Sequence, residues 1–365
     1  MKVVAKIGSS SLTTVTGEIE HRAVAKICAE VAELNSLGHK TVVVTSAAVS
    51  AGLAPLGYNA ANRPKEAEKL RAASAVGQIA LMATYKGHLA SNGLTAGQVL
   101  LAPTDMWYRN RYLKSRGTLQ ALLEAGVVPV INENDAVADD EIRFGDNDRL
   151  AALVAHLIDA DRLVLLTDTA GVFTADPRHD ENASLIEEVI EIDQHLERVV
   201  GGPGSSLGRG GMASKLAAAK IAAWSGVETT IAQSDRPNVL LDAVSGEPGV
   251  GTVFRAHKQR LPARKLWIAF ALPASGRIIV DGGARRAIEN ERRSLLAAGI
   301  IKADGEFPAD AAVEVFDERG NLFAKGLTRW DSQQIGAHAG STSDVFPSDL
   351  PEEVIHRDDL VMLPS

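Results

Sequence analysis

The chain of 365 residues has a single cysteine, no excess of basic charge and no long apolar run. Its one cysteine, Cys28, cannot form an intramolecular disulfide, which excludes a disulfide-stabilised scaffold and fits a reducing compartment. Cys28 falls in a helical pattern, where we expect a core side chain rather than a nucleophile.

The lack of excess basic charge and of long apolar runs also disfavours two classes of protein, nucleic-acid binders and membrane or secreted proteins. The formal net charge of -8 argues against a general nucleic-acid binder, which needs basic patches to displace counterions. No uninterrupted apolar run approaches the roughly 18 residues of a membrane span, and residues 1–7 are too short an apolar run for a signal peptide. We therefore expect a cytoplasmic protein without a membrane or nucleic-acid partner, although its net charge still permits a local basic pocket for an anionic substrate.

Metal-binding clusters of histidine and cysteine are also missing from the sequence. The nine histidines are scattered, and none pairs at HxxxH or HExxH spacing. We therefore assign no side chain as a metal ligand. The chemistry is expected to come from lysines, glycine-rich segments and carboxylates.

What the chain does contain is an alternation of unbroken apolar strands and helices up to about residue 256. We expect strands at residues 3–7, 40–45, 95–101, 127–131, 162–166, 227–232 and 249–254, and helices at residues 21–37, 65–90, 109–124, 148–158 and 212–225. Strands that are apolar throughout are typical of a parallel sheet covered on both faces. The predicted fold is therefore α/β, a three-layer αβα sandwich around a mainly parallel sheet.

The pattern changes after residue 256, and the length of the chain already favours two domains. Residues 257–275 begin with a basic, proline-containing stretch and are predicted to form a linker. Short strand candidates at residues 266–271, 277–280, 312–316 and 322–327 are separated by glycine, proline and aspartate turns. We therefore predict one domain at residues 1–256 and a small β-rich, barrel-like domain at residues 276–365.

Polar side chains gather after the predicted strand at residues 127–131. Asn132-Glu133-Asn134-Asp135 follows the strand directly, and Asp146-Asn147-Asp148 opens the next helix. A helix cap needs only one such residue, whereas the two clusters carry seven carboxylate or amide groups. Because open α/β sheets bind ligands at the carboxyl ends of their strands, we interpret the clusters as part of a ligand site.

Two lysines are placed to meet a phosphate. Lys6 lies inside an apolar strand before a glycine and three serines, and it either reaches solvent at the strand end or, as we favour, pairs with an anion. Gly210-Gly211-Met212-Ala213-Ser214-Lys215 is either a surface loop or a phosphate-binding helix start, but it is not a Walker motif. Lysines, glycine-rich segments and carboxylates together suit phosphoryl transfer, in which positioning and charge neutralisation do most of the work.

Taken in order, these motifs resemble the amino-acid kinase family over nearly the whole chain. The segments that carry the resemblance are Lys6-Ile7-Gly8-Ser9-Ser10, Val44-Thr45-Ser46-Ala47-Ala48, Val130-Ile131-Asn132-Glu133-Asn134-Asp135, Gly145-Asp146-Asn147-Asp148, Leu166-Thr167-Asp168, Thr174-Ala175-Asp176-Pro177 and Gly210-Gly211-Met212-Ala213-Ser214-Lys215. The pair of acidic and amide clusters is its most specific part. Residues 276–365 resemble the PUA domain that many bacterial members carry.

The resemblance implies ATP-dependent phosphorylation of the L-glutamate side-chain carboxylate to L-glutamyl 5-phosphate, the first step of proline biosynthesis, with Mg²⁺. Lys6 and Lys215 would stabilise the migrating phosphoryl group, and Asp148 would orient both lysines. Glutamate would be held by Ser46, Asp135 and Asn147. ATP would be held by Lys6, Thr167, Asp168, Arg209, Gly210, Gly211, Met212, Ala213, Ser214 and Lys215.

Feedback inhibition by L-proline at or near the glutamate site and a homo-oligomer, a dimer or tetramer, are implied as well.

Two positions depart from the family's pattern. Ala47 stands where glycine follows the serine, and its methyl group would crowd a backbone approach to substrate or phosphate. Arg209 stands in place of a small residue or threonine, and would add a phosphate contact or point to solvent. Both bear on affinity more than on the reaction.

The residues agree with this chemistry independently of the family. A glutamate side chain with a pKa of about 4.3 is ionised at neutral pH, so it attacks without a general base. Two lysines and Mg²⁺ would offset the repulsion between anionic attacking and leaving groups.

Two alternatives remain open on the sequence. The first is another acyl-phosphate kinase of this fold, acting on aspartate, N-acetylglutamate or carbamate. The second is an RNA-binding module that acts through the PUA-like domain. From residue 273 onward there are 10 Lys and Arg against 16 Asp and Glu, and an acidic domain binds a phosphate backbone poorly.

Overall fold

The computed structural model describes residues 1–14, 16–59, 61–102, 105–106, 108–137, 146–193, 196–197, 211–258, 260–342, 345–347 and 350–363. The chain forms two compact units, Met1–Arg260 and Leu261–Ser365. None of the described helices is long and apolar enough to cross a membrane.

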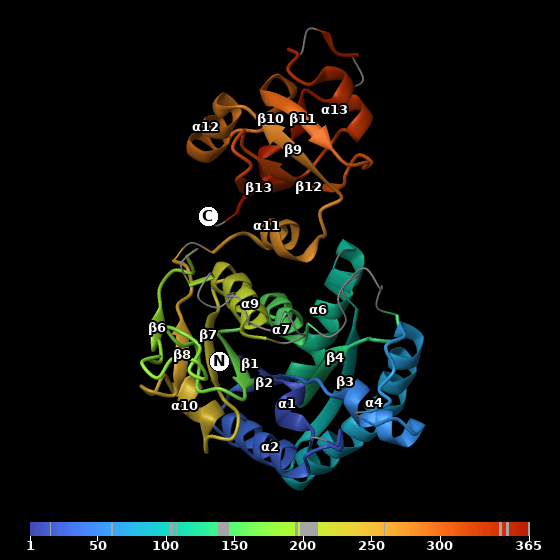
Figure 1. The fold of residues 1–365 in the computed structure, drawn as a ribbon, viewed down its shortest axis with the longest axis vertical. Helices are drawn as coiled ribbons and strands as arrows, with labels where there is room; N and C mark the ends of the chain where they lie inside the picture. Colours follow the sequence, from blue (N-terminus) through green and yellow to red (C-terminus); the bar gives the residue numbers. More distant parts are fainter. Residues whose placement is uncertain are drawn as a thin grey trace. The chain divides into compact units, whose positions relative to one another are not determined.

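An eight-stranded sheet, counted over the described residues, forms the centre of the first unit (Figure 1). Its strands are β1 (Lys2–Ile7), β2 (Lys40–Val44), β3 (Thr95–Leu101), β4 (Val127–Glu133), β5 (Arg162–Thr167), β6 (Glu188–Val189), β7 (Glu228–Gln233) and β8 (Gly251–Phe254). Their order in the sheet is β3-β4-β2-β1-β5-β7-β8-β6, and only β7 and β8 pair antiparallel. The prediction of a mainly parallel sheet is confirmed.

Helices cover both faces of this sheet (Figure 1). The helices of the first unit are α1 (Ser9–Leu12), α2 (His21–Ser36), α3 (Ala48–Leu53), α4 (Ala67–Ser91), α6 (Arg109–Glu124), α7 (Asn147–Leu157), α9 (Met212–Trp224) and α10 (Val239–Ser245), with a 3₁₀ turn at Ala54–Leu56. Residues of α2, α4 and α10 form one core with Val3, Ala5 and Ile7 of β1. Because side chains alternate along a strand, Lys6 points to the other face, where α7 packs on β1 and α9 packs on α7. The predicted three-layer sandwich is confirmed.

The crossing of α3 and α4 has no side chain between the two helices. A Cβ added at Gly52 would lie 1.7 Å from the carbonyl oxygen of Ala73, and one at Gly77 would lie 1.9 Å from that of Ala48. Only glycine permits so close an approach of two backbones. The crossing therefore fixes α4 against the segment that follows β2.

The second unit is rich in β-structure, as predicted. Its elements are β9 (Gly276–Val280), α12 (Gly282–Glu291), β10 (Leu295–Leu296), β11 (Ile300–Asp304), β12 (Ala312–Phe316), β13 (Leu322–Leu327), α13 (Ser332–His338), β14 (Glu353–Ile355) and β15 (Leu360–Met362), with 3₁₀ turns at Ala297–Gly299 and Arg357–Asp359. A five-stranded sheet, β11-β9-β12-β13-β15, lies beside the pair β10-β14. The fully buried Trp330 packs edge-on against Phe346, with ring centroids 5.0 Å apart.

One strand prediction is wrong. Residues 266–271 continue α11 (Ala263–Leu266) as a π-helical turn, Trp267–Ala271. A short apolar run without turn residues fits a buried helix as well as a strand, and periodicity alone does not separate the two. The other predicted strands each lie within two residues of an observed strand.

Candidate active site

A buried carboxylate, that of Asp148, lies between two buried lysines. The Nζ atom of Lys6 is 2.5 Å from Oδ1 of Asp148, and the Nζ atom of Lys215 is 3.2 Å from Oδ2. The exposed fraction is 4% for each lysine side chain and 0% for that of Asp148. The three residues come from β1, α7 and α9, so segments far apart in the sequence meet at one point. The structure thus brings together the three residues predicted to act on the phosphoryl group.

The charges of this cluster shift one another's pKa values. Burial lowers the pKa of Lys6 by removing its ammonium group from water; Asp148 opposes this effect and Lys215 adds to it. Burial alone would raise the pKa of Asp148, but the two lysines outweigh it and hold that pKa below the usual range of a carboxyl group. Asp148 is therefore ionised at neutral pH. With both lysines protonated the cluster carries a net positive charge, which suits an incoming phosphate.

A second contact joins the starts of α7 and α9. Asp146 caps α7 by accepting a hydrogen bond from the backbone N–H of Arg149 at 3.1 Å. The same oxygen, Oδ1, accepts a hydrogen bond from the Ser214 hydroxyl at 2.5 Å. The two aspartates of this cluster therefore make different contacts. Asp146 caps the helix, and Asp148 pairs with the lysines.

Apart from Lys6, the described residues that were predicted to hold ATP lie at the end of β5 and at the start of α9. Thr167 ends β5 and donates its hydroxyl hydrogen bond to Oδ1 of the exposed Asp168 at 3.0 Å. Gly211 is the N-cap of α9, and no side chain caps the first turn, Met212–Lys215. Its N–H groups can therefore reach an anion. Two members of the predicted set, Arg209 and Gly210, lie outside the described residues.

The residues predicted to hold glutamate follow β2 and β4 and open α7. Ser46 is half-buried and comes just after β2, the neighbour of β4 in the sheet. Asp135 is buried just beyond β4 and accepts a hydrogen bond from the Ser74 hydroxyl of α4 at 2.5 Å. Asn147 is buried as the first residue of α7, and its Oδ1 has no hydrogen-bond partner within the described part of the chain. An acceptor left without a donor in a buried place suits a ligand that brings an N–H group.

The residue after Ser46 has an unusual backbone. Ala47 adopts φ 83° and ψ 0°, in the left-handed region, as the N-cap residue of α3. This conformation costs an L-residue other than glycine about 1–2 kcal/mol. The departure from glycine noted in the sequence therefore places strain in the turn that carries Ser46.

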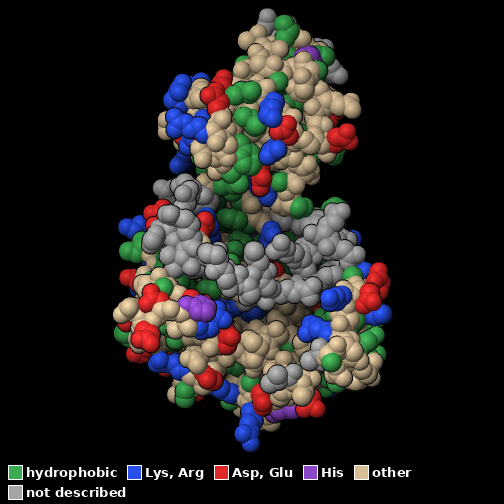
Figure 2. Space-filling model, viewed as in Figure 1, with side chains coloured by type: hydrophobic (Ala, Val, Ile, Leu, Met, Phe, Trp, Pro, Cys, Tyr) green, Lys and Arg blue, Asp and Glu red, His purple; other side chains and the backbone are tan. Residues whose placement is uncertain are grey.

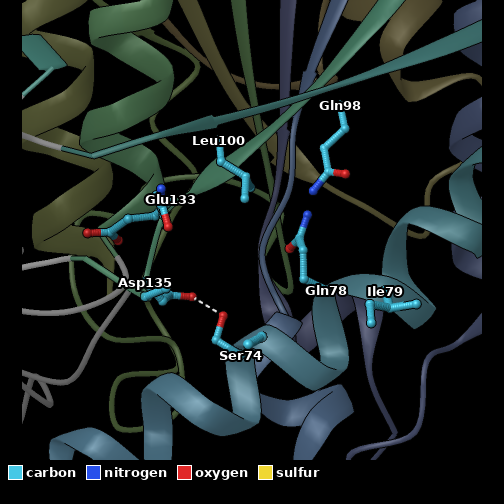
Figure 3. A pocket seen from close by; sticks show the side chains of 10 residues that line it. Ser74, Gln78, Ile79, Gln98, Leu100, Glu133 and Asp135 are labelled. Carbon is cyan, nitrogen blue, oxygen red and sulfur yellow. Dashed lines mark hydrogen bonds between the residues drawn. The ribbon is translucent and has the colours of Figure 1, made fainter.

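A cavity of about 290 Å³ opens where β4 ends (Figure 3). Its lining residues come from α4, β3 and the end of β4, namely Ser74, Ala75, Gln78, Ile79, Gln98, Leu100, Glu133, Asn134, Asp135 and Ala136. Lys6, Asp148 and Lys215 are not among them. Of the three residues predicted to hold glutamate, Asp135 lines this cavity, whereas Ser46 and Asn147 do not.

Two polar residues of this site, Ser74 and Gln78, were not singled out in the sequence. They lie one turn apart on the buried face of a long, largely apolar helix. Asp146 was predicted to belong to the ligand site, and the structure places it as the N-cap of α7. Two polar side chains at i and i+4 within an apolar stripe are the one signal that would have found the α4 pair.

No group of three or more potential metal ligands occurs among the described residues. Mg²⁺ typically keeps several waters and is bound through substrate phosphates plus one or two carboxylates, so such a group is not required for it.

The chain was compared with known proteins. Residues 1–233 match the amino acid kinase family, and residues 276–344 match the PUA domain. A protein of Cupriavidus taiwanensis named Glutamate 5-kinase is 43% identical over 99% of this chain and 98% of its own length. A protein of Vibrio campbellii with the same name is 43% identical over 99% of this chain and 96% of its own. The solved UMP kinase of Bacillus anthracis is 17% identical over 70% of this chain and 95% of its own, with a TM-score of 0.49.

The family match extends through the strands and helices that supply Lys6, Asp148 and Lys215, and the likeness to the relatives spans both units. The order of motifs, the parallel sheet and the match therefore agree. The chain belongs to the amino acid kinase family and carries a PUA domain.

Proposed function

We propose that the chain transfers the γ-phosphoryl group of ATP to the side-chain carboxylate of L-glutamate, giving ADP and L-glutamyl 5-phosphate, the first step of proline biosynthesis. The observation that carries the proposal is the buried Lys6–Asp148–Lys215 cluster at the carboxyl ends of parallel strands. The full-length likeness to two proteins named Glutamate 5-kinase selects the acceptor.

The cluster supplies what this reaction needs. The acceptor carboxylate is already ionised at neutral pH, so no general base is required. The difficulty is charge, because an anion must approach a phosphate, and two ammonium groups offset that repulsion. Asp148, which contacts both lysines, keeps their Nζ atoms at fixed positions.

The remaining roles are proposed from the resemblance of the motifs to those of the family. Ser46, Asp135 and Asn147 hold glutamate, which comes to the ends of β2 and β4. ATP is held by Lys6, Thr167, Asp168, Arg209, Gly210, Gly211, Met212, Ala213, Ser214 and Lys215, with its phosphates at the start of α9. Mg²⁺, when bound with ATP, neutralises further phosphate charge.

Further features belong to the same proposal through the chain's likeness to its relatives. We propose feedback inhibition by L-proline, a homo-oligomer, a cytoplasmic location, and a division into residues 1–256, a linker at 257–275 and residues 276–365. The acidic balance of the second unit argues against RNA as its ligand. Over the visible face of the first unit, basic and acidic side chains are interspersed rather than gathered in a basic patch (Figure 2).

The test is ADP release by the purified chain with ATP, Mg²⁺ and a panel of acids, with hydroxylamine trapping of the acyl phosphate. We expect ADP release and hydroxamate formation with L-glutamate well above those with aspartate, N-acetylglutamate or carbamate. Higher turnover with one of the other acids would contradict the proposed acceptor. Salt-dependent retention of RNA on a filter would revive the alternative of an RNA-binding module.

A further inference from the structure

One polar group in the cavity beside Asp135 is buried without a partner. Gln78 of α4 is 8% exposed and lines the cavity, and its Nε2 atom has no hydrogen-bond partner among the described residues. A buried amide donor without an acceptor costs about 1–3 kcal/mol. Such a group in a cavity indicates a ligand that brings an acceptor.

The orientation of this amide is fixed by a chain of hydrogen bonds that begins at the backbone. The N–H of Glu133 can only donate, and it donates to Oδ1 of Asn132 at 2.9 Å. The other end of the Asn132 amide is therefore Nδ2, which donates to Oε1 of Gln78 at 2.9 Å. What remains of Gln78 is its NH₂ group. Reversing the Asn132 amide alone would lose both bonds, reversing the Gln78 amide alone would lose the bond between the two side chains, and reversing both would lose the bond from the Glu133 N–H.

The lining of the cavity narrows the class of ligand. Its volume of about 290 Å³ lies at the lower end of small-molecule sites. Glu133 and Asp135 also line it. In Figure 3 the Asp135 carboxylate faces Ser74, whereas that of Glu133 points away from Gln78 and Gln98. The negative charge of Asp135 disfavours a simple anion. A zwitterion resolves this conflict, because its ammonium group suits carboxylates while its own carboxylate suits the Gln78 amide.

The cavity also defines which end of the substrate it receives. The side-chain carboxylate of glutamate must reach the phosphoryl group beside Lys6 and Lys215, and neither lysine lines the cavity. The end that remains for the cavity is the α-carbon with its ammonium and carboxylate groups. In Figure 3 the labelled side chains of Gln78 and Gln98 point toward the same space, above Ser74 and Asp135.

We propose that this cavity binds the α-ammonium and α-carboxylate groups of the amino-acid substrate, and that Gln78 is a specificity-determining residue whose amide N–H donates to the α-carboxylate. The inference rests on the proposed phosphorylation of glutamate. It assigns a substrate contact to α4, and it gives the buried Asn132 the role of a positioning residue that orients Gln78.

The experiment compares Gln78→Glu with the wild-type chain in the ADP-release assay. The glutamate side chain keeps an oxygen for Asn132 and places a second oxygen where the donor was. We expect the KM for L-glutamate to rise by about 10- to 100-fold, the size of a lost hydrogen bond to a charged group, while kcat and the KM for ATP change less than about 3-fold. The matched control is Gln120→Glu on α6, which makes the same change in charge away from the cavity.

Thermal unfolding of each variant shows whether it is folded, and Gln78→Met, which removes the donor without adding charge, serves if Gln78→Glu is not. A KM for glutamate within 2-fold of the wild-type value in a folded variant would overturn the inference. Parallel rises in both KM values would also overturn it, since they indicate a structural role. A wild-type chain without glutamate-dependent ADP release would instead contradict the proposed function, and the inference with it.

Discussion

The two halves of the candidate site are built in different ways. Around Lys6 and Lys215 the side chains are held by full charges, with Asp148 as the shared partner. Around Asp135 hydroxyl and amide groups of α4 take part, because Ser74 donates to Asp135 and Gln78 accepts from Asn132. Both halves are buried, and the first places two lysines around one carboxylate.

The difference matches what each half has to do. Phosphoryl transfer needs strong, preorganised charge at the moment when negative charge moves between oxygens. Recognition of an amino acid needs donors and acceptors at defined positions, and a buried hydrogen bond rejects a molecule that cannot complete it. The comparison therefore separates residues that should affect turnover from residues that should affect substrate affinity.

The largest effect is expected in the charged half. Lys6→Ala and Lys215→Ala should each lower kcat by roughly 10²-fold or more, because each variant loses one of the two charges proposed to meet the phosphoryl group. Circular dichroism should show folded protein, since Asp148 keeps one lysine in each variant. Lys69→Ala is the control, since Lys69 is exposed on α4 and its one ion pair within the described part of the chain is with Glu66. Near wild-type turnover in either active-site variant would remove the proposed role.

An intermediate effect is expected from the helix crossing that supports α4 beside Asp135. Gly77→Ala places a methyl group 1.9 Å from the carbonyl oxygen of Ala48, so the helices must separate. We expect a loss of at least about 2 kcal/mol in the free energy of unfolding in urea, together with a higher KM for glutamate. Gly87→Ala in the same helix meets nothing within 4 Å and should gain up to about 1 kcal/mol. Equal stability of Gly77→Ala and Gly87→Ala would show that α3 and α4 can separate at little cost in free energy, and would contradict this prediction.

The smallest effect concerns the strained turn beside Ser46. Ala47→Gly relieves a left-handed alanine at φ 83°, and should raise the free energy of unfolding by about 0.5–1 kcal/mol after the entropy cost of glycine. Ala54→Gly, at an ordinary helical φ of -61°, should lower it by about 0.5–1 kcal/mol. Urea unfolding measures both. A loss of stability in both variants would mean that the Ala47 methyl contributes more by packing than its backbone costs.

Much of the first unit could be predicted from the sequence, because long apolar runs and caps specify single elements. The strand that holds Lys6 is marked by an apolar run, and the helix that Asp146 caps is marked by its cap and by an apolar pattern. Both elements form in the structure as these local patterns predict. The contact of Asp148 with both lysines was implied by the resemblance to the family, while the position of the acidic clusters at the carboxyl ends of strands was predicted from the sheet.

The rest depends on contacts that no local pattern encodes. Residues 266–271 have the composition of a strand, yet they form a helical turn. Ser74 and Gln78 gain their importance only from what faces α4 across more than fifty residues of sequence. The same holds for Gly52 and Gly77, whose lack of a side chain becomes meaningful only when the partner helix is in place.

The direct backbone contact between α3 and α4 has a mechanical consequence. At Gly52 and Gly77 the backbones of the two helices are in direct contact, with no side chain between them. We therefore expect a small displacement of one helix to displace the other. One helix begins two residues after Ser46, and the other carries Gln78. We therefore expect a molecule that pushes against the cavity wall to move the serine turn as well, so that the two proposed substrate contacts, Ser46 and Gln78, respond together.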